Sequence, residues 1–251
     1  MADTGLTAIL TVWKRESLAR QLQALAGQTR RPDAIWIYHC GTHLDVSAIV
    51  RSIDWADVNY FRAEHDLGYF GRFALATMAS TALTTIIDDD MMPGRRWLEY
   101  ALAKQAHHKA VISGQGCLLP VRSNDIRAGL YPALKGRAAK DTRVDFGCCS
   151  WLFRTELAHH MWSIPPLHLR NAEDMHFGAA CARLGIATVV PQQTANETSA
   201  DIEPDWTFDE HASFRNEARY ALERNATLGY LRALGWRLRS DPANPKSKQP
   251  R

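Results

Sequence analysis

Short apolar runs alternate with stretches of helical periodicity through the first half of the chain, and this alternation limits the fold more than any other feature. Strand-like runs are expected at residues 7–13, 34–38, 58–62, 84–87 and 111–114, with helices expected at 17–25, 46–53 and 73–80. In the first helix Leu18, Leu22 and Leu25 recur at i, i+4 and i+7 and share one face. Such alternation is typical of β-α-β units, so the sequence predicts the α/β class, with a mostly parallel central sheet flanked by helices.

The second half of the chain is less regular. Pro93 occupies a favoured first-turn position, so a helix is expected to begin there. The next expected elements are a long loop at 122–143, a strand at 144–153, a helix at 172–184 and a strand at 186–190. A helical C-terminal appendage should follow, with a mobile polar connection at 194–205, a mostly helical tail at 209–236 and a disordered basic end at 241–251. The predicted domains are therefore 1–192 and 193–251.

Composition argues against several classes of protein. The 251 residues include 30 Lys and Arg against 27 Asp and Glu, a formal charge of +3, so no nucleic-acid partner is expected. No run approaches the roughly 18 apolar residues of a membrane span, and the polar start lacks the layout of a signal peptide, which favours a cytoplasmic protein. Five cysteines without a C-x-x-C pair indicate neither a disulfide framework nor a zinc ribbon, and we expect buried thiols.

The motif with the clearest chemistry is a run of three carboxylates after the apolar strand expected at 84–87. In open α/β sheets ligands bind at the carboxyl ends of the strands, which is where Asp88, Asp89 and Asp90 fall. Alternation along a strand would project Asp88 and Asp90 to one side, where they could share a divalent cation, with Asp89 pointing elsewhere. The alternative interpretation is a solvated acidic loop.

Three short motifs follow one another along the chain: TVWKR at 11–15, the aspartates at 88–90 and NAED at 171–174. Together they resemble the motifs of nucleotide-sugar glycosyltransferases with the GT-A fold, and of family 2 in particular. The resemblance spans about residues 6–192. It implies a Rossmann-like domain that moves a sugar from a nucleotide-diphosphate sugar to an acceptor hydroxyl with inversion. It also implies a glycan or lipid-linked acceptor, in polysaccharide or glycoconjugate assembly.

The resemblance implies roles for individual residues. Asp90 would bind Mn²⁺ or Mg²⁺, Asp88 would contact the ribose or the metal, and His211 would be a third metal ligand. The other residues expected at the donor are Thr11, Trp13, Arg15, Asp66, Arg72 and Asp89. Asp174 would remove the proton of the acceptor hydroxyl, with Glu173 and Trp151 lying beside the acceptor.

Purely structural roles for the same residues stay open. Core packing, solvation or helix capping could equally explain Trp13, Arg15, Asp66, Arg72 and Trp151. Glu173 and Asp174 could simply complement a helix dipole. His39-Cys40-Gly41 stands where the family often has an aspartate that reads the base, so the sequence leaves the base undetermined.

Other functions compete with sugar transfer. A catalytically silent GT-A-like module would bind sugars or nucleotides without turnover. A phosphoribosyltransferase could also place acids after an apolar strand, but Met91-Met92-Pro93 follows here instead of the small Thr and Gly residues that cradle phosphate. A Rossmann dehydrogenase is excluded, because no G-x-G-x-x-G follows the first strand.

The predicted tail is amphipathic. Leu228, Leu231, Leu234 and Trp236 alternate with basic residues such as Arg232. This face could rest on an anionic membrane, which would make the protein peripheral at the inner face of the membrane, or it could pack on the domain or on another subunit. Packing is the favoured interpretation, and the sequence leaves the oligomeric state undetermined.

Overall fold

The structure, a computed structural model, describes residues 5–121, 123, 125–131, 138–203, 211 and 217–241. The predicted disorder of residues 242–251 lies outside the described residues, as do parts of the loop expected at 122–143 and most of the segment 204–216. Among the described residues, no helix combines the length and the apolar character needed to cross a bilayer.

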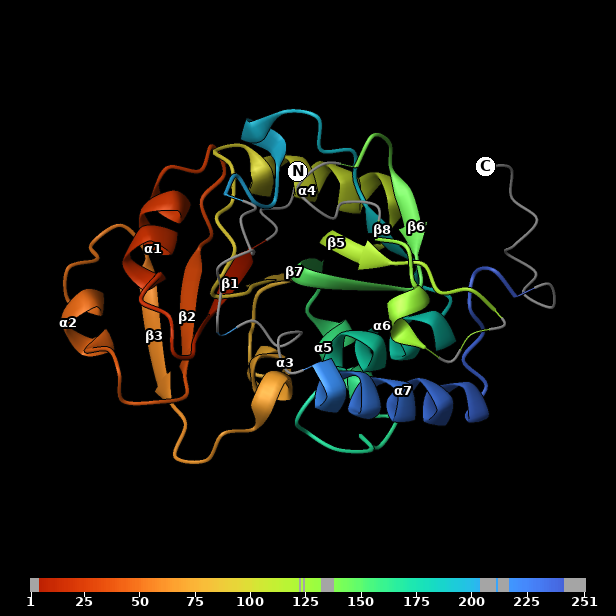
Figure 1. The fold of residues 1–251 in the computed structure, drawn as a ribbon. Helices are drawn as coiled ribbons and strands as arrows, with labels where there is room; N and C mark the ends of the chain where they lie inside the picture. Colours follow the sequence, from red (N-terminus) through yellow and green to blue (C-terminus); the bar gives the residue numbers. More distant parts are fainter. Residues whose placement is uncertain are drawn as a thin grey trace.

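An eight-stranded sheet forms the centre of the described structure, in the order β3-β2-β1-β4-β7-β5-β8-β6 (Figure 1). The strands are β1 Leu6–Val12, β2 Ala34–His39, β3 Asp57–Arg62, β4 Leu83–Ile87, β5 Val111–Cys117, β6 Thr142–Val144, β7 Phe146–Arg154 and β8 Thr188–Val190. β3, β2, β1 and β4 are parallel, as are β5 and β8. β7 runs antiparallel to β4 and β5, and β6 runs antiparallel to β8. The prediction of a mostly parallel α/β sheet is confirmed.

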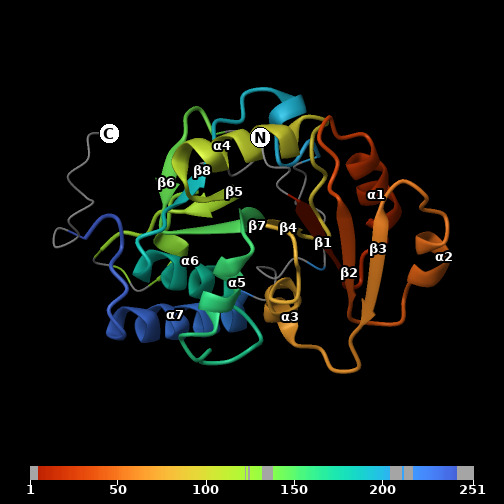
Figure 2. The ribbon, with the colours of Figure 1, turned by 180° about the vertical axis from the view of Figure 1, so that it is seen from behind.

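Helices cover both faces of the sheet. They are α1 Leu18–Ala26, α2 Val46–Val50, α3 Gly71–Ala76, α4 Trp97–His108, α5 Glu156–Met161, α6 Glu173–Arg183 and α7 Glu217–Ala233. Because strand side chains alternate, Leu10 of β1 belongs to the core cluster that includes α1, α2 and α4, whereas Ile9 belongs to the cluster that includes α3, α5 and α6. Seen from behind, β4 lies between β7 and β1 (Figure 2). With strands on both edges and helices on both faces, β4 is buried throughout.

The helix expected to begin at Pro93 begins instead at Trp97. The residues between them pair with a segment that follows β8: the Gly94 N–H donates to Ser199 O at 2.9 Å, and the Arg96 N–H donates to Glu197 O at 2.7 Å. These long-range bonds satisfy the backbone groups of the segment without helix formation. The favoured helical position of Pro93 was therefore misleading.

The single strand expected at 144–153 is two strands, which are separated at Asp145. Asp145 is buried, and its carboxylate accepts the N–H groups of Leu119 at 2.7 Å and Arg239 at 2.6 Å. The chain changes partners here, because β6 pairs with β8 whereas β7 pairs with β4 and β5. α5, which follows β7, was not predicted.

The C-terminal helix α7 packs on the domain, as the sequence analysis favoured. Leu228, Leu231 and Trp236 are buried in one cluster with Phe146 of β7 and Met175 of α6. Figure 1 shows α7 lying along the outer side of α6. Of the apolar side chains that could have faced a membrane or another subunit, these three are instead buried in the domain, whereas Leu234 is exposed.

Candidate active site

The candidate site is centred on residues 88–91, here called the aspartate turn, at the carboxyl end of the parallel strands. β1 and β4 are in register so that Leu10 pairs with Ile87. Residues 11–15, which comprise the end of β1 and the segment after it, therefore lie at the same edge of the sheet as the turn. In open α/β sheets this edge is where ligands bind.

The three aspartates do not continue the strand, because β4 ends at Ile87. The Asp88 N–H donates to Cys149 O at 2.9 Å, and the Met91 N–H then donates to Asp88 O at 3.0 Å, which closes the turn. The expectation that Asp88 and Asp90 project together by strand alternation was therefore wrong in its reasoning, since the chain turns at Asp88.

Arg15, just before α1, and Gln21, within α1, bind the aspartate turn. Arg15 Nη1 donates to Asp89 Oδ1 at 2.5 Å, and Arg15 Nη2 lies 3.6 Å from Asp90 Oδ2. Gln21 is fully buried and donates to two carbonyl oxygens of the turn, at 2.7 and 2.9 Å. Arg15 is therefore a partner of the acidic residues and not a solvated side chain. The contribution of Gln21 was missed, because a polar residue within a helix does not reveal its distant partners.

Arg72 connects the aspartate turn to the start of α6. Its Nη2 lies 3.1 Å from Asp88 Oδ1 and donates to Glu173 Oε1 at 2.7 Å. The guanidinium is buried and lies 5.5 Å from the ring centre of Tyr69 and 5.2 Å from that of Trp151. Arg72 is therefore an interior cation shared by two carboxylates, and the interpretation as a surface residue is wrong.

The other residues expected at the donor occupy varied surroundings. The Oγ1 atom of Thr11 is buried and makes no hydrogen bond with a described residue. A polar group of a ligand could therefore form a hydrogen bond with it. Trp13 is half-buried, with Lys14 Nζ 4.4 Å from its ring centre. Asp66 is exposed and accepts the Gly68 N–H at 2.7 Å, so in this structure it caps the turn that precedes α3.

Trp151 is a core residue in this structure. It is 2% exposed, its ring lies 5.2 Å from that of Phe73, and its Nε1 donates to Gly147 O at 3.1 Å. Its ring also lies 5.2 Å from the guanidinium carbon of Arg72, and the predicted acceptor contact of Trp151 stays a prediction. A small-residue stretch beside an aromatic residue does not by itself distinguish these two environments.

Glu173 and Asp174 form the first turn of α6, and both are buried. Ala172 precedes them with a left-handed backbone, φ 67°. Asp174 Oδ1 accepts the Met175 N–H at 2.6 Å, and Oδ2 accepts Nη2 of Arg224 from α7 at 2.7 Å. Their negative charge also complements the N-terminus of the helix. Sequence reasoning missed Arg224, because nothing local in the tail indicates its partner.

Burial and crowding raise the pKa values of the acidic groups. Removal from water raises the pKa of Asp88 well above its usual range, although Arg72 opposes the shift. Burial likewise raises the pKa of Asp89 to about 7, against the lowering effect of Arg15. Burial raises the pKa of Glu173 to about 7, against Arg72. Each ionised form is therefore costly without further positive charge.

A divalent cation would offset this charge. Ion pairs among the described residues join the carboxylates of Asp88, Asp89, Asp90, Glu173 and Asp174 to the guanidinium groups of Arg15, Arg72 and Arg224. This network carries a formal excess of two negative charges. Asp88 Oδ1 and Asp89 Oδ2 are buried and make no hydrogen bond with a described group; the 3.1 Å contact to Asp88 is an ion pair without hydrogen-bond geometry. The residues present therefore fit an oxygen-binding cation.

The predicted metal ligands do not form a ready-made binding site among the described residues. Within the described part of the chain, no three His, Cys, Asp or Glu side chains are arranged to hold a metal ion. The predicted set of Asp88, Asp90 and His211 is thus not assembled here, and the role of His211 as a third ligand stays a prediction.

The pH dependence of unfolding tests the environment of Glu173. The folded pKa of about 7 lies above the ordinary value of 4.5, so the folded chain holds an extra proton between these pH values. The free energy of unfolding should therefore fall as pH rises from about 4.5 to about 7, by an amount of order 3 kcal/mol, and level off above. Glu173→Gln keeps an oxygen for Arg72 and should lose this part of the slope in urea unfolding.

A matched control exists at the start of α5, where Glu156 is exposed. Glu156→Gln removes a helix-start carboxylate without removing a buried one and should leave the slope as in the wild type. Equal slopes for Glu173→Gln and the wild type would contradict the assigned environment.

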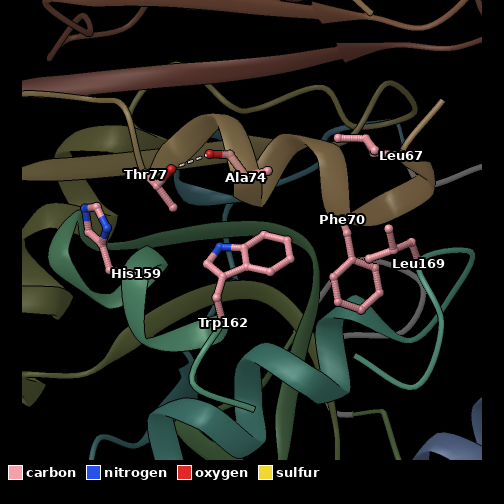
Figure 3. A pocket seen from close by; sticks show the side chains of 7 residues that line it. All are labelled: Leu67, Phe70, Ala74, Thr77, His159, Trp162 and Leu169. Carbon is pink, nitrogen blue, oxygen red and sulfur yellow. Dashed lines mark hydrogen bonds between the residues drawn. The ribbon is translucent and has the colours of Figure 1, made fainter. Parts of the chain in front are cut away.

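An apolar groove of about 500 Å³ lies between α3 and α5 (Figure 3). It is lined by Leu67, Phe70, Ala74, Thr77, His159, Trp162 and Leu169. None of the ion-paired residues of the site lines it. The groove and the acidic site are therefore distinct features of the molecule.

No protein-family model matches the chain, and no curated protein sequence matches it. Several solved structures do match the fold of the chain. The mannosyltransferase PcManGT from Pyrobaculum calidifontis, in complex with GDP-Man and Mn²⁺, superposes with a TM-score of 0.61 at 16% identity, over 87% of this chain and 62% of that one. GalNAc-T7 with UDP, GalNAc and Mn²⁺ gives 0.59 at 12% identity, over 74% and 41%. Residues 1–349 of S. aureus TarS give 0.55 at 18% identity, over 76% and 59%.

The chain has the GT-A fold. This GT-A chain spans less than two thirds of the length of each of these structures. The fold expected from the sequence motifs is confirmed, whereas membership of family 2 stays a prediction.

Proposed function

We propose that this GT-A chain is a metal-dependent glycosyltransferase that moves a sugar from a nucleotide-diphosphate sugar to an acceptor hydroxyl. The observation that carries the proposal is the connection of the aspartate turn to the first turn of α6 through buried Arg72. Solved structures of the same fold hold GDP-Man or UDP together with Mn²⁺. The excess negative charge around the turn supports cation binding at the same place.

In the proposed reaction, Asp174 accepts the proton of the acceptor hydroxyl while the acceptor oxygen attacks C1 of the sugar. The bond between C1 and the phosphate oxygen breaks, and the nucleoside diphosphate leaves with its electron pair. Asp88 and Asp90 would hold Mn²⁺ or Mg²⁺, which when bound neutralises charge on the leaving diphosphate. Direct displacement with one base predicts inversion at C1.

The surroundings of the reacting groups complete the proposal. Thr11, near the end of β1, and Trp13 and Arg15, just after it, lie at the same sheet edge as the aspartate turn, where they would contact the base and the phosphates. A glycan or lipid-linked acceptor would approach from the side of α6. With such a donor and acceptor, the proposed role of the protein is in polysaccharide or glycoconjugate assembly.

Nucleotide binding tests the donor site. Purified protein is titrated calorimetrically with UDP, GDP, dTDP and CMP, each with Mn²⁺ and again with EDTA. One nucleotide should bind in a metal-dependent manner, and Asp90→Ala should weaken that binding by more than about tenfold. The control is Asp57→Ala, because Asp57 is exposed on the edge strand β3. This variant should bind the nucleotide with the affinity of the wild type.

The outcomes separate the competing functions. Metal-dependent binding that Asp90→Ala loses, together with sugar transfer by the wild type, supports the proposal and identifies the base. Binding without transfer of any sugar would favour a silent GT-A-like module. Absence of binding to every nucleotide would contradict the assigned donor site.

A further inference from the structure

Arg224 reaches the candidate catalytic pair from the C-terminal helix. Its Nη2 donates to Asp174 Oδ2 at 2.7 Å, and its Nη1 donates to Asn171 Oδ1 at 3.3 Å. Both Arg224 and Asp174 are about 95% buried. The guanidinium carbon lies 5.0 Å from the ring centre of Tyr220 and 5.6 Å from that of Phe146. The side chain thus lies near two aromatic rings and also makes an ion pair.

These contacts span the point where the backbone enters α6. Ala172 has a left-handed backbone that side-chain-bearing residues rarely adopt, and such conformations persist only when their surroundings hold them. Asn171 Oδ1 accepts the Ala172 N–H at 2.7 Å. Arg224 binds the residue before Ala172 and, through Asp174, the second residue after it. It therefore fixes both sides of this bend.

The ion pair also fixes the orientation of the Asp174 carboxylate. One oxygen accepts the Met175 N–H, and the other accepts Arg224, so both ends of the group have a defined partner. A carboxylate oxygen offers two lone pairs, so each oxygen can still accept a proton from a hydroxyl. General base catalysis needs this kind of orientation, since reach and geometry come before acidity.

We propose that Arg224 is the positioning residue for the Asp174 carboxylate, and that α7 thereby completes the acceptor side of the site. This inference rests on the proposed glycosyl transfer with Asp174 as base. α7 then has two roles. Its buried leucines attach it to the domain, and its buried Arg224 orients the reacting carboxylate.

Sugar transfer by Arg224 variants tests the inference, with the donor nucleotide identified by titration. In Arg224→Ala, kcat should fall about 100-fold, the size of effect expected when a reacting group is misplaced. KM for the donor and the affinity for the Mn²⁺–nucleotide complex should stay near the wild-type values, because the aspartate turn is untouched. Guanidinium ion, added below the concentration that unfolds the wild type, should restore part of kcat.

Two further variants test whether the effect depends on the guanidinium fork and on this particular arginine. Arg224→Lys keeps the charge without the planar fork that contacts both Asn171 and Asp174, so it should lose less than Arg224→Ala and show no rescue by guanidinium. Arg219→Ala removes an exposed arginine of the same helix, which pairs with Glu223, and should leave kcat unchanged.

The outcomes are distinguishable. Unchanged kcat in Arg224→Ala, or equal losses of kcat and nucleotide affinity without rescue, would overturn the positioning role while the proposed function stands. If Arg224→Ala does not fold, a kcat for Arg224→Lys equal to that of the wild type would overturn it. No transfer by the wild type from any sugar nucleotide would overturn the proposed function, even if Arg224 and Asp174 remain coupled in a double-mutant cycle of unfolding free energies.

Discussion

Asp174→Asn should abolish nearly all sugar transfer, with kcat lower by about 10²–10⁴-fold. The amide of asparagine keeps the size of the side chain and an oxygen for Arg224 or for the Met175 N–H. It cannot accept the proton of an acceptor hydroxyl at neutral pH. Transfer rates of the wild type and the variant, measured with the same donor and acceptor, check this result.

The control must separate lost chemistry from lost folding. Asp141→Asn is matched to it, because Asp141 also accepts hydrogen bonds from a cation and a backbone N–H, here Lys104 and Gln192, away from the site. This control should keep its transfer rate. Asp174→Asn should still bind the Mn²⁺–nucleotide complex, since the aspartate turn is unchanged. Undiminished transfer by Asp174→Asn would eliminate Asp174 as the base.

The sequence predicts the fold well where the signal is local and repeated. β1, β2 and β4 were predicted from apolar runs, because buried parallel strands need largely continuous apolar sequence, and α1 was predicted from its leucine spacing. The position of the aspartate turn was also predicted, since it comes directly after the wholly buried β4. These features depend on neighbours within a few residues.

What the sequence does not predict depends on partners far along the chain. β6 ends before Asp145, whose carboxylate accepts the N–H groups of Leu119 and Arg239, which are 26 and 94 residues away. Arg224 lies 50 residues from Asp174. Neither local spacing nor composition indicates such pairs, so they emerge only when the chain is folded. This is why the acidic motifs of the site were found from the sequence and their arginine partners were only partly found.

Arg72→Gln should be among the most destabilising single substitutions in the chain. Removal of the guanidinium leaves Asp88 and Glu173 without the cation that they share, and breaking a buried ion pair in this way costs about 3–5 kcal/mol. Chemical denaturation at neutral pH measures the loss. Arg96→Gln, at an exposed arginine paired with Glu99, should leave the free energy of unfolding close to that of the wild type.

The loss in free energy of unfolding caused by Arg72→Gln should itself depend on pH, because the carboxylates left without a cation can be protonated. Arg72 lowers the pKa values of Asp88 and Glu173 against the effect of burial, so its loss raises both further. At low pH both groups are neutral and need no cation, whereas at higher pH their ionisation in the folded state is unfavourable. The difference in unfolding free energy between variant and wild type should therefore widen as pH rises. A difference that stays constant with pH would show that Arg72 stabilises the fold by packing alone, through its contacts with Trp151 and Tyr69.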